Sequence, residues 1–285
     1  LLLWAWIDGH ARPEQGPWLL YLSPTNLCNL RCAVCARHKT MRKERGFLTL
    51  ETLDTILAKL PESISKVYLQ KQGEPLMNPQ IVEIAKRVRA RWPKAQLAMH
   101  TNGIFMTEDR AKALAPLLDF VAFSISGISE ATYLTCHGRP HLARALTGLE
   151  AFLAARHAVG AYDGNVVIDY VRQNGNRDET PEEVRAFFHK RFPGLNSLDS
   201  HWTDSFQDSI EESRLAMHEV LPSADFPRCV WPFSSLCVLH DGTVDYCFVE
   251  PRENAPGPSL LTHSFEEIWH GPYLSGLRED RKSVV

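Results

Sequence analysis

Cys28-Asn29-Leu30-Arg31-Cys32-Ala33-Val34-Cys35 carries three thiols at CxxxCxxC spacing, directly after an apolar, strand-like segment at residues 18–22. Three thiolates on one short loop can hold three irons of a 4Fe-4S cluster and leave the fourth iron without a protein ligand. That iron is then open to an added ligand. The spacing therefore indicates Cys28, Cys32 and Cys35 as ligands of a 4Fe-4S cluster.

Other thiol chemistries have to be weighed against this interpretation. Seven cysteines in 285 residues is far below the density of a disulfide-stapled secreted domain, and the N-terminus shows no signal-peptide pattern. A zinc site usually recruits a fourth Cys or His at its own short spacing, and the nearest candidate is His38. Scattered structural thiols would not be expected at a cluster spacing directly after a strand. The iron-sulfur interpretation explains both the spacing and the position.

The cysteine loop, with the apolar Val34 before its third thiol, resembles the cluster loop of the radical S-adenosylmethionine (SAM) superfamily. After a strand-like segment at residues 66–70, Gly73-Glu74-Pro75 resembles the GGEP turn of that family, with Gln72 in place of the first glycine. The resemblance implies that this turn receives the methionyl ammonium of SAM, and glycine allows such a close approach. Taken alone, a GEP tripeptide would more often be only the turn before a helix.

Two further strand-like segments, at residues 96–100 and 120–125, run into polar residues. The first is followed by Asn102, which we expect at the height of the cofactor. The second continues into Ser126-Gly127 and resembles the SIDG segment of the family, although Ser126 stands where Asp is commoner. The resemblance implies that Ser124 and Ser126 contact the ribose hydroxyls of SAM.

A fifth strand is expected at residues 166–173, with Arg172 and Asn174 at its exit. Contact with SAM and an ordinary solvated strand end are both open for these two residues.

Strand-like segments alternate with helical patterns over the first two-thirds of the chain. Such alternation predicts βαβ units with right-handed crossovers and a parallel sheet whose carboxyl strand ends carry the chemistry. We therefore predict an α/β fold, a partial (β/α)6 TIM-like barrel over residues 1–200. Apolar residues recur at helical spacing in five segments, with Pro79 and Pro181 in first helical turns: residues 49–60, 79–91, 108–118, 142–157 and 181–190.

A linker at residues 201–225, with one helix at 208–218, is expected to lead to a small C-terminal domain at residues 226–285. Asp241-Gly242 between two apolar runs indicates a β-hairpin. The hairpin and the later segment at residues 264–269 resemble the SPASM or twitch extension of radical SAM enzymes, a β-hairpin plus helix that binds an auxiliary 4Fe-4S cluster. The resemblance implies Cys229, Cys237 and Cys247 as its ligands, but the further CxxC of that family is missing from this sequence.

In the family chemistry, SAM yields a 5′-deoxyadenosyl radical that takes a hydrogen atom from a substrate C–H bond. Loss of an electron to an auxiliary cluster would make a dehydrogenase, whereas return of a hydrogen atom from Cys237 would make an epimerase. An open auxiliary iron could instead bind the substrate or donate sulfur. Cys237 as a small buried hydrophobe is equally open. Cys136, between Tyr133 and His137, is expected to be a packed structural thiol.

The net charge and the hydropathy of the chain exclude two classes of partner, nucleic acids and membranes. A net charge of −3 and a pI near 6.5 leave no electrostatic footprint for nucleic acid, and the apolar residues 1–7 are too short to cross a bilayer. Reduced thiols without an export signal indicate the cytoplasm, with a reductant such as flavodoxin or ferredoxin.

The substrate class remains open between a small polar metabolite, such as a sugar or aminocyclitol, and a peptide. About fifteen residues ahead of the first strand contain no recognisable leader-binding domain, which favours the small metabolite. An iron-sulfur electron carrier or zinc scaffold without catalysis is a different class, and the GEP turn argues against it.

Overall fold

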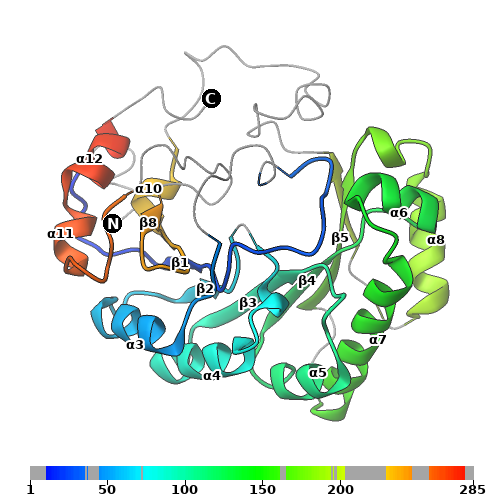
Figure 1. The fold of residues 1–285 in the computed structure, drawn as a ribbon, viewed down its shortest axis with the longest axis horizontal. Coiled ribbons are helices and arrows are strands. Elements are labelled where there is room, and N and C mark those ends of the chain that lie inside the picture. The colour runs from blue at the N-terminus through cyan, green and yellow to red at the C-terminus, as the bar shows by residue number, and fades with distance from the viewer. Residues whose placement is uncertain are drawn as a thin grey trace.

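A computed structural model describes residues 11–35, 37, 45–71, 73–160, 165–193, 195, 198–202, 229–245 and 257–279. The strands in these residues are β1 (Leu19–Leu22), β2 (Lys66–Tyr68), β3 (Gln96–Thr101), β4 (Phe120–Ser124), β5 (Val166–Arg172), β6 (Leu198–Trp202), β7 (Ser235–Val238) and β8 (Val244–Asp245). They form one sheet in the order β6-β5-β4-β3-β2-β1-β7-β8, in which only β8 runs antiparallel to its neighbour. Figure 1 shows this sheet as a curved, open arch. The predicted α/β partial barrel is confirmed.

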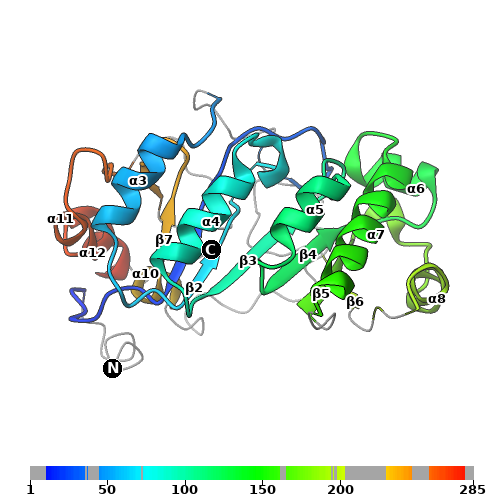
Figure 2. The ribbon, with the colours of Figure 1, turned by 90° about the horizontal axis from the view of Figure 1, so that it is seen from below.

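The helices that follow the parallel strands cover the convex side of the arch (Figures 1 and 2). Every second strand residue is buried against them, for example Leu20, Val67 and Leu97, while the alternate residues face the inner side. These helices are α3 (Leu50–Lys59), α4 (Ile81–Arg91), α5 (Glu108–Leu114), α6 (Glu130–His137), α7 (Leu142–Ala158) and α8 (Pro181–Arg191). Two short 3₁₀ turns, η1 (Pro75–Met77) and η3 (Asn174–Asn176), precede α4 and α8.

The first five strands and the five patterned helices occur where the sequence predicts them, with two corrections at helix ends. Helix α4 begins at Ile81, so Pro79 lies before the helix and not in its first turn. The reason is Asn78, whose Oδ1 accepts the Gln80 amide and closes a separate turn there. Helix α5 ends at Leu114 and not at residue 118, because Pro116 cannot donate a backbone hydrogen bond.

The sixth strand was not located by the sequence pattern. β6 pairs in parallel with β5, with Ile168 opposite Leu198, and it extends past residue 200 into the segment expected to be linker. Its sequence, Leu-Asp-Ser-His-Trp, has three polar residues in a row and no β-branched residue, so it lacks the composition typical of a strand. The remaining linker and its expected helix at residues 208–218 lie outside the described residues.

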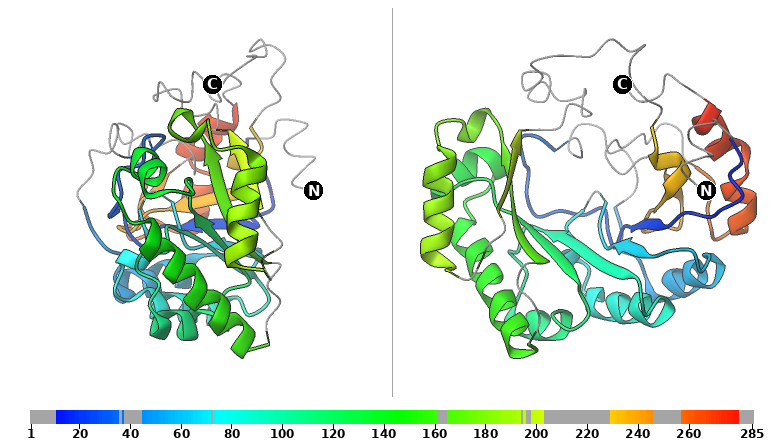
Figure 3. Two further views of the ribbon diagram at one scale, coloured as in Figure 1. Left: turned by 90° about the vertical axis from the view of Figure 1, so that its right-hand side faces the viewer. Right: turned by 180° about the vertical axis from the view of Figure 1, so that it is seen from behind.

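The C-terminal hairpin is confirmed, with Cys237 opposite Asp245 and Val238 opposite Val244. β7 also pairs in parallel with β1, so the hairpin continues the barrel sheet. Three helices lie at this end of the arch, as the rear view in Figure 3 shows: α10 (Trp231–Ser234), α11 (Phe265–Trp269) and α12 (Pro272–Glu279). The domain boundaries expected near residues 200 and 226 stay predictions. Among the described helices, none has the length and apolar character needed to cross a membrane.

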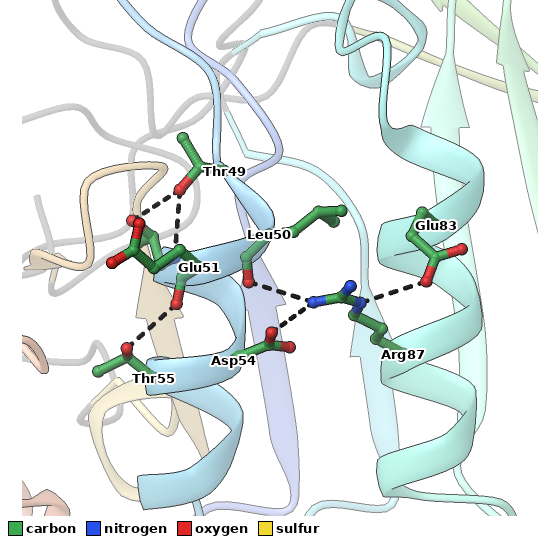
Figure 4. Close-up of polar contacts among 8 residues, drawn as sticks. Thr49, Leu50, Glu51, Asp54, Thr55, Glu83 and Arg87 are labelled. Atoms are coloured by element: carbon green, nitrogen blue, oxygen red, sulfur yellow. Dashed lines mark hydrogen bonds and ion pairs between the residues drawn. The ribbon is translucent and has the colours of Figure 1, made fainter.

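Polar contacts on the outer surface between α3 and α4 add little to this framework. Figure 4 shows Arg87 between the two helices, where it pairs with Asp54 and donates to Glu83 Oε1 at 3.2 Å and to the Leu50 carbonyl at 3.4 Å. Exposed ion pairs of this kind contribute little to stability. The helices are therefore held mainly by their buried apolar faces.

Asn78 is the polar centre of the region behind the GEP turn, and its side chain is fully buried. Its Nδ2 donates to the carbonyls of Pro24 and Leu48 at 2.8 and 3.0 Å, and its Oδ1 accepts the Gln80 amide at 2.8 Å. One side chain thus joins the segment after β1, the start of α3 and the start of α4.

Replacing Asn78 with alanine should lower the free energy of unfolding by about 2–4 kcal/mol, because two buried carbonyls and the part-buried Gln80 amide lose their partner. Urea denaturation followed by circular dichroism measures this loss. The matched control is Asn174→Ala at an exposed asparagine, which should change the free energy by less than about 0.5 kcal/mol. Equal losses in the two variants would contradict the central role of Asn78.

Candidate functional site

The cysteine loop follows β1 at the carboxyl edge of the sheet and rests on the C-terminal end of α6. The Arg31 amide donates to the His137 carbonyl at 3.0 Å, and the Ala33 amide donates to the Cys136 carbonyl at 2.9 Å. The helix ends at Gly138, whose φ of +70° suits glycine and where a Cβ would lie 2.6 Å from the Arg31 carbonyl oxygen. The otherwise unpaired carbonyls of the helix end therefore fix the loop.

The three thiols of this loop are half-buried and close enough to influence one another. Burial, together with the Glu74 carboxylate, raises the pKa of Cys28 to about 11. Burial followed by the Cys35 and Cys28 thiols raises the pKa of Cys32 well above its usual range, and burial raises that of Cys35. Metal ions supply the positive charge that such thiolates lack. The thiols therefore fit a cationic metal centre.

The CxxxCxxC spacing of this loop fits a 4Fe-4S cluster. Among the described residues, no three His, Cys, Asp or Glu side chains gather as ligands of one metal ion would. A 4Fe-4S cluster instead holds its thiolates on separate irons, so the thiols need not converge on one point. His38, the candidate zinc ligand, lies outside the described residues.

His137 connects the loop to the strand edge through both of its ring nitrogens. Its Nε2 lies 2.9 Å from the Ser126 amide nitrogen, and its Nδ1 lies 3.2 Å from the Cys32 sulfur. Burial lowers the pKa of His137 to about 4, so the ring is neutral at physiological pH. The Tyr133 ring stacks on it with the ring centroids 4.2 Å apart.

Two buried polar atoms beside the loop have no hydrogen-bond partner among the described residues. One is the hydroxyl of Tyr133, which is fully buried and whose pKa is raised by burial and by the charges of Cys32 and Glu74. The other is Nδ2 of Asn29, in the cysteine loop itself. Buried polar atoms are rarely left unsatisfied. Both therefore fit a site that a bound group completes.

Glu74 lies next to the loop and is 3% exposed. Its carboxylate accepts hydrogen bonds from the Thr101 hydroxyl at 2.5 Å, the Asn102 amide at 2.7 Å and the Leu76 amide at 3.1 Å. Burial nevertheless raises its pKa, and no described cation forms a salt bridge with it. A carboxylate in this position favours a cationic ligand.

The turn that carries Glu74 is pressed against the cysteine loop. The Glu74 amide donates to the Leu27 carbonyl at 2.7 Å. A Cβ on Gly73 would overlap the Thr25 carbonyl oxygen and lie 2.6 Å from that of Leu27. The close packing of the chain's own backbone therefore requires a glycine at position 73, independently of any ligand that approaches the turn. Pro75 is buried and opens η1.

Asn102 joins Glu74 to the cysteine loop. Its amide bonds to Glu74, its Nδ2 donates to Asn29 Oδ1 at 2.9 Å, and its Oδ1 accepts the Ile104 amide at 3.0 Å. The residues predicted from the cysteine motif, the GEP turn and the end of β3 are thus gathered at one place.

The other predicted contacts are placed differently. The Ser126 hydroxyl is buried and accepts the Val171 amide at 3.0 Å, while the Ser124 hydroxyl is half-buried and donates to Asp169 Oδ2 at 3.3 Å. Arg172 donates to the carbonyls of Glu179 and Arg177 at 3.2 and 3.4 Å. Val34 is half-buried in the cysteine loop. The cofactor contacts of these four residues stay predictions.

The burial of the side chains on the inner side of the sheet changes from one end of the sheet to the other. From β2 to β5 the larger inner residues are half-buried, including Tyr68, His100 and Asp169, whereas Ala98 and Ala122 are buried. At β1 and β7 it is closed, since Cys237 is 2% exposed and packs with Leu19 and Tyr21. That burial agrees with a small buried hydrophobe and leaves the ligand and donor roles of Cys237 as predictions.

Of the other predicted auxiliary ligands, Cys229 is half-buried just before α10, and Cys247 lies outside the described residues. The hairpin is nevertheless tied to the GEP turn. Lys71 Nζ bonds to Asp245 Oδ2 at 2.6 Å, and both side chains are buried.

His137 and Tyr133 are site residues that were not predicted from the sequence, although Cys136 between them was expected to be a packed thiol. Their spacing of four residues on one short helix, ending at Gly138, is a signal that places both rings on one helix face. Nothing in the sequence indicates that this face meets the cysteine loop.

The chain spans about half the length of a curated relative that it matches. It is 29% identical over 172 residues to the tungsten-containing aldehyde ferredoxin oxidoreductase cofactor-modifying protein of Pyrococcus furiosus, covering 58% of this chain and 47% of that protein.

Two solved structures share the fold. Superposition on BtrN in complex with AdoMet and 2-DOIA gives a TM-score of 0.57 at 15% identity and covers 95% of this chain and 89% of that one. Superposition on Streptococcus suis SuiB bound to precursor peptide SuiA gives a TM-score of 0.70 at 14% identity and covers 93% of this chain and 67% of that one.

The family model described as Radical SAM superfamily matches residues 22–188, which is more than half of the chain and includes the cysteine loop, Glu74 and α6. The chain belongs to the radical SAM superfamily, whose members use a 4Fe-4S cluster and SAM.

Proposed function

We propose that Cys28, Cys32 and Cys35 hold the 4Fe-4S cluster and that Glu74 binds the methionyl ammonium of SAM beside it. The observation that carries this proposal is the buried Glu74 carboxylate, which lies near enough to Cys28 to raise the pKa of that thiol, accepts three hydrogen bonds and forms no salt bridge with a described residue. An ammonium group would supply the missing charge. Gly73, Pro75 and Asn102 position the carboxylate, and Val34 contributes apolar cover in the loop.

When bound, the cluster and SAM would supply one-electron reductive cleavage of SAM and removal of a hydrogen atom from the substrate. The chain's own residues provide burial and orientation. The packed loop, the GEP turn and α6 partly cover the thiols, and Asn102 fixes the distance between Glu74 and the loop. Ser124, Ser126 and Arg172 are candidates for further SAM contacts at the ends of β4 and β5.

We propose a small polar substrate of the sugar or aminocyclitol type, bound on the inner side of the sheet. Asp169 beside Ser124 offers a carboxylate and a hydroxyl to amino and hydroxyl groups. Tyr68 and His100 are half-buried with their ring centroids 5.7 Å apart, which gives a wall suited to the C–H faces of a ring. The shared fold with BtrN, whose structure was solved with AdoMet and 2-DOIA, is consistent with such a ligand. A peptide, as in the SuiB complex, is the second candidate.

The reaction that follows hydrogen abstraction depends on the C-terminal thiols. We propose an epimerisation if Cys237 returns a hydrogen atom, or an oxidation if Cys229, Cys237 and Cys247 hold an auxiliary 4Fe-4S cluster in a SPASM or twitch-like unit. Cys237 lies opposite Tyr21 on the neighbouring strand, at the closed end of the inner side. Electrons would come from a donor such as flavodoxin or ferredoxin in a reducing cytoplasm.

Changing Cys28, Cys32 or Cys35 to alanine should abolish SAM cleavage, because each change leaves one iron without its thiolate. The measurement is 5′-deoxyadenosine formed after anaerobic reduction with SAM. Cys136→Ala removes a buried thiol outside the motif and should retain cleavage. Formation at the wild-type rate by any of the three motif variants would refute the assignment.

Changing Glu74 to glutamine should weaken SAM binding about tenfold to a hundredfold while sparing iron content, because a charge-assisted hydrogen bond becomes a neutral one. Equilibrium binding of SAM to the reconstituted protein measures the effect. Glu130→Gln is the matched control, since Glu130 also accepts a backbone amide, that of Ala143 at 3.0 Å, but lies exposed on α6. Equal SAM affinity in wild type and Glu74→Gln would show that the turn is only structural.

Changing Cys237 to alanine separates the roles of this thiol. As an auxiliary ligand, its loss should lower iron content and destabilise the C-terminal unit, because metal binding contributes to folding. As a hydrogen-atom donor, its loss should keep iron and SAM cleavage but stop product formation. In deuterated water the wild type would then place deuterium at the inverted carbon. Wild-type iron content and wild-type turnover in Cys237→Ala would show that Cys237 is only a small buried hydrophobic residue.

A further inference from the structure

His137 makes one hydrogen bond with each ring nitrogen, and the two bonds together define its protonation. The backbone N–H of Ser126 points at Nε2 over 2.9 Å. A backbone amide can only donate, so Nε2 accepts and carries no hydrogen. A ring whose Nε2 accepts a hydrogen bond carries its proton on Nδ1, and Nδ1–H faces the Cys32 sulfur at 3.2 Å.

The ring is held in this orientation from several sides. It is 4% exposed and stacks on Tyr133 one helical turn earlier. Close packing also fixes the Ser126 side, because a Cβ on Gly127 would lie 2.6 Å from the Tyr133 amide nitrogen. The Cys32 side is fixed by the amides of Arg31 and Ala33, which bond to the last carbonyls of the same helix. The donor is therefore preorganised toward the sulfur.

We propose that His137 is a positioning residue for the cluster, whose Nδ1–H donates a hydrogen bond to the Cys32 thiolate and raises the reduction potential of the cluster. The inference rests on the proposed function in one respect, namely that Cys32 is a cluster ligand. A hydrogen bond to a ligand sulfur draws negative charge away from the cluster and favours its reduced form, which carries one more electron. The Ser126 amide sets the tautomer and so determines that a donor, and not a lone pair, faces the sulfur.

The test is the midpoint potential of the reconstituted cluster, measured by anaerobic titration with dithionite and EPR detection in the absence of SAM. His137→Phe keeps an aromatic ring on Tyr133 but removes the donor. We expect about a tenfold lower ratio of reduced to oxidised cluster at a fixed potential, a shift of about 59 mV to more negative values for a one-electron couple. His137→Asn can place an amide donor where Nδ1 lies and should restore most of this shift.

Ser129→Ala is the matched control for a general disturbance of α6. It removes the cap at the start of that helix, where the Ser129 hydroxyl accepts the Thr132 amide, and does not touch His137. The midpoint potential of this variant should equal that of the wild type. An unchanged potential in His137→Phe would overturn the proposal. An equal shift in Ser129→Ala and His137→Phe would also overturn it, because helix packing would then be the cause.

A second measurement does not depend on the folding of His137→Phe. Pulsed EPR of the reduced wild-type cluster with ¹⁵N-labelled histidine should detect a coupled imidazole nitrogen, and His137→Asn should lose that signal. Absence of the coupling in the wild type would overturn the proposal. A protein that binds no 4Fe-4S cluster would instead refute the proposed function, so the two failures are distinguishable.

Discussion

The backbone hydrogen bonds of the cysteine loop are the constraint on which the site depends. The loop has little secondary structure of its own, so its shape is set by two neighbours. On one side the Leu27 carbonyl accepts the amide of Glu74, and on the other the Arg31 and Ala33 amides bond to the end of α6. Gly73 and Gly138 are required because a side chain at either position would strike the loop backbone. Thiols, carboxylate and histidine are therefore placed by the same few contacts.

This packing brings together groups whose charged forms are all disfavoured by burial. The pKa values of the three thiols and of Glu74 are raised, and that of His137 is lowered. Such a set would be costly as a purely structural feature, because buried polar groups need compensating partners. Iron beside the thiols and an ammonium beside Glu74 would supply positive charge where it is missing. A neutral His137 needs no such partner and can serve as a donor.

The sequence predicts the parts of this arrangement that are local. The thiol spacing, the GEP turn, the first five strands and the hairpin follow from short patterns, and each occurs where expected. His137 and Asn78 could not be predicted, because their partners are distant in sequence and their residue types have no special pattern. β6 could not be predicted for a different reason, since three of its five residues are polar and none is β-branched. A strand is recognisable in a sequence when one of its faces is buried and the other is not. The site, in contrast, depends on contacts between residues that are distant in the sequence.

The ion pair between Lys71 and Asp245 connects the cofactor side of the site to its C-terminal side. Lys71 lies two residues before Gly73, and Asp245 is the direct partner of Cys237 in the antiparallel register. Both side chains are buried, and removing one partner of a buried pair leaves an uncompensated charge, which is strongly destabilising. The turn that carries Glu74 and the strand that carries Cys237 are thus held at one separation. Cys237 therefore lies at a fixed distance from the turn that carries Glu74, because the hairpin is part of the same sheet.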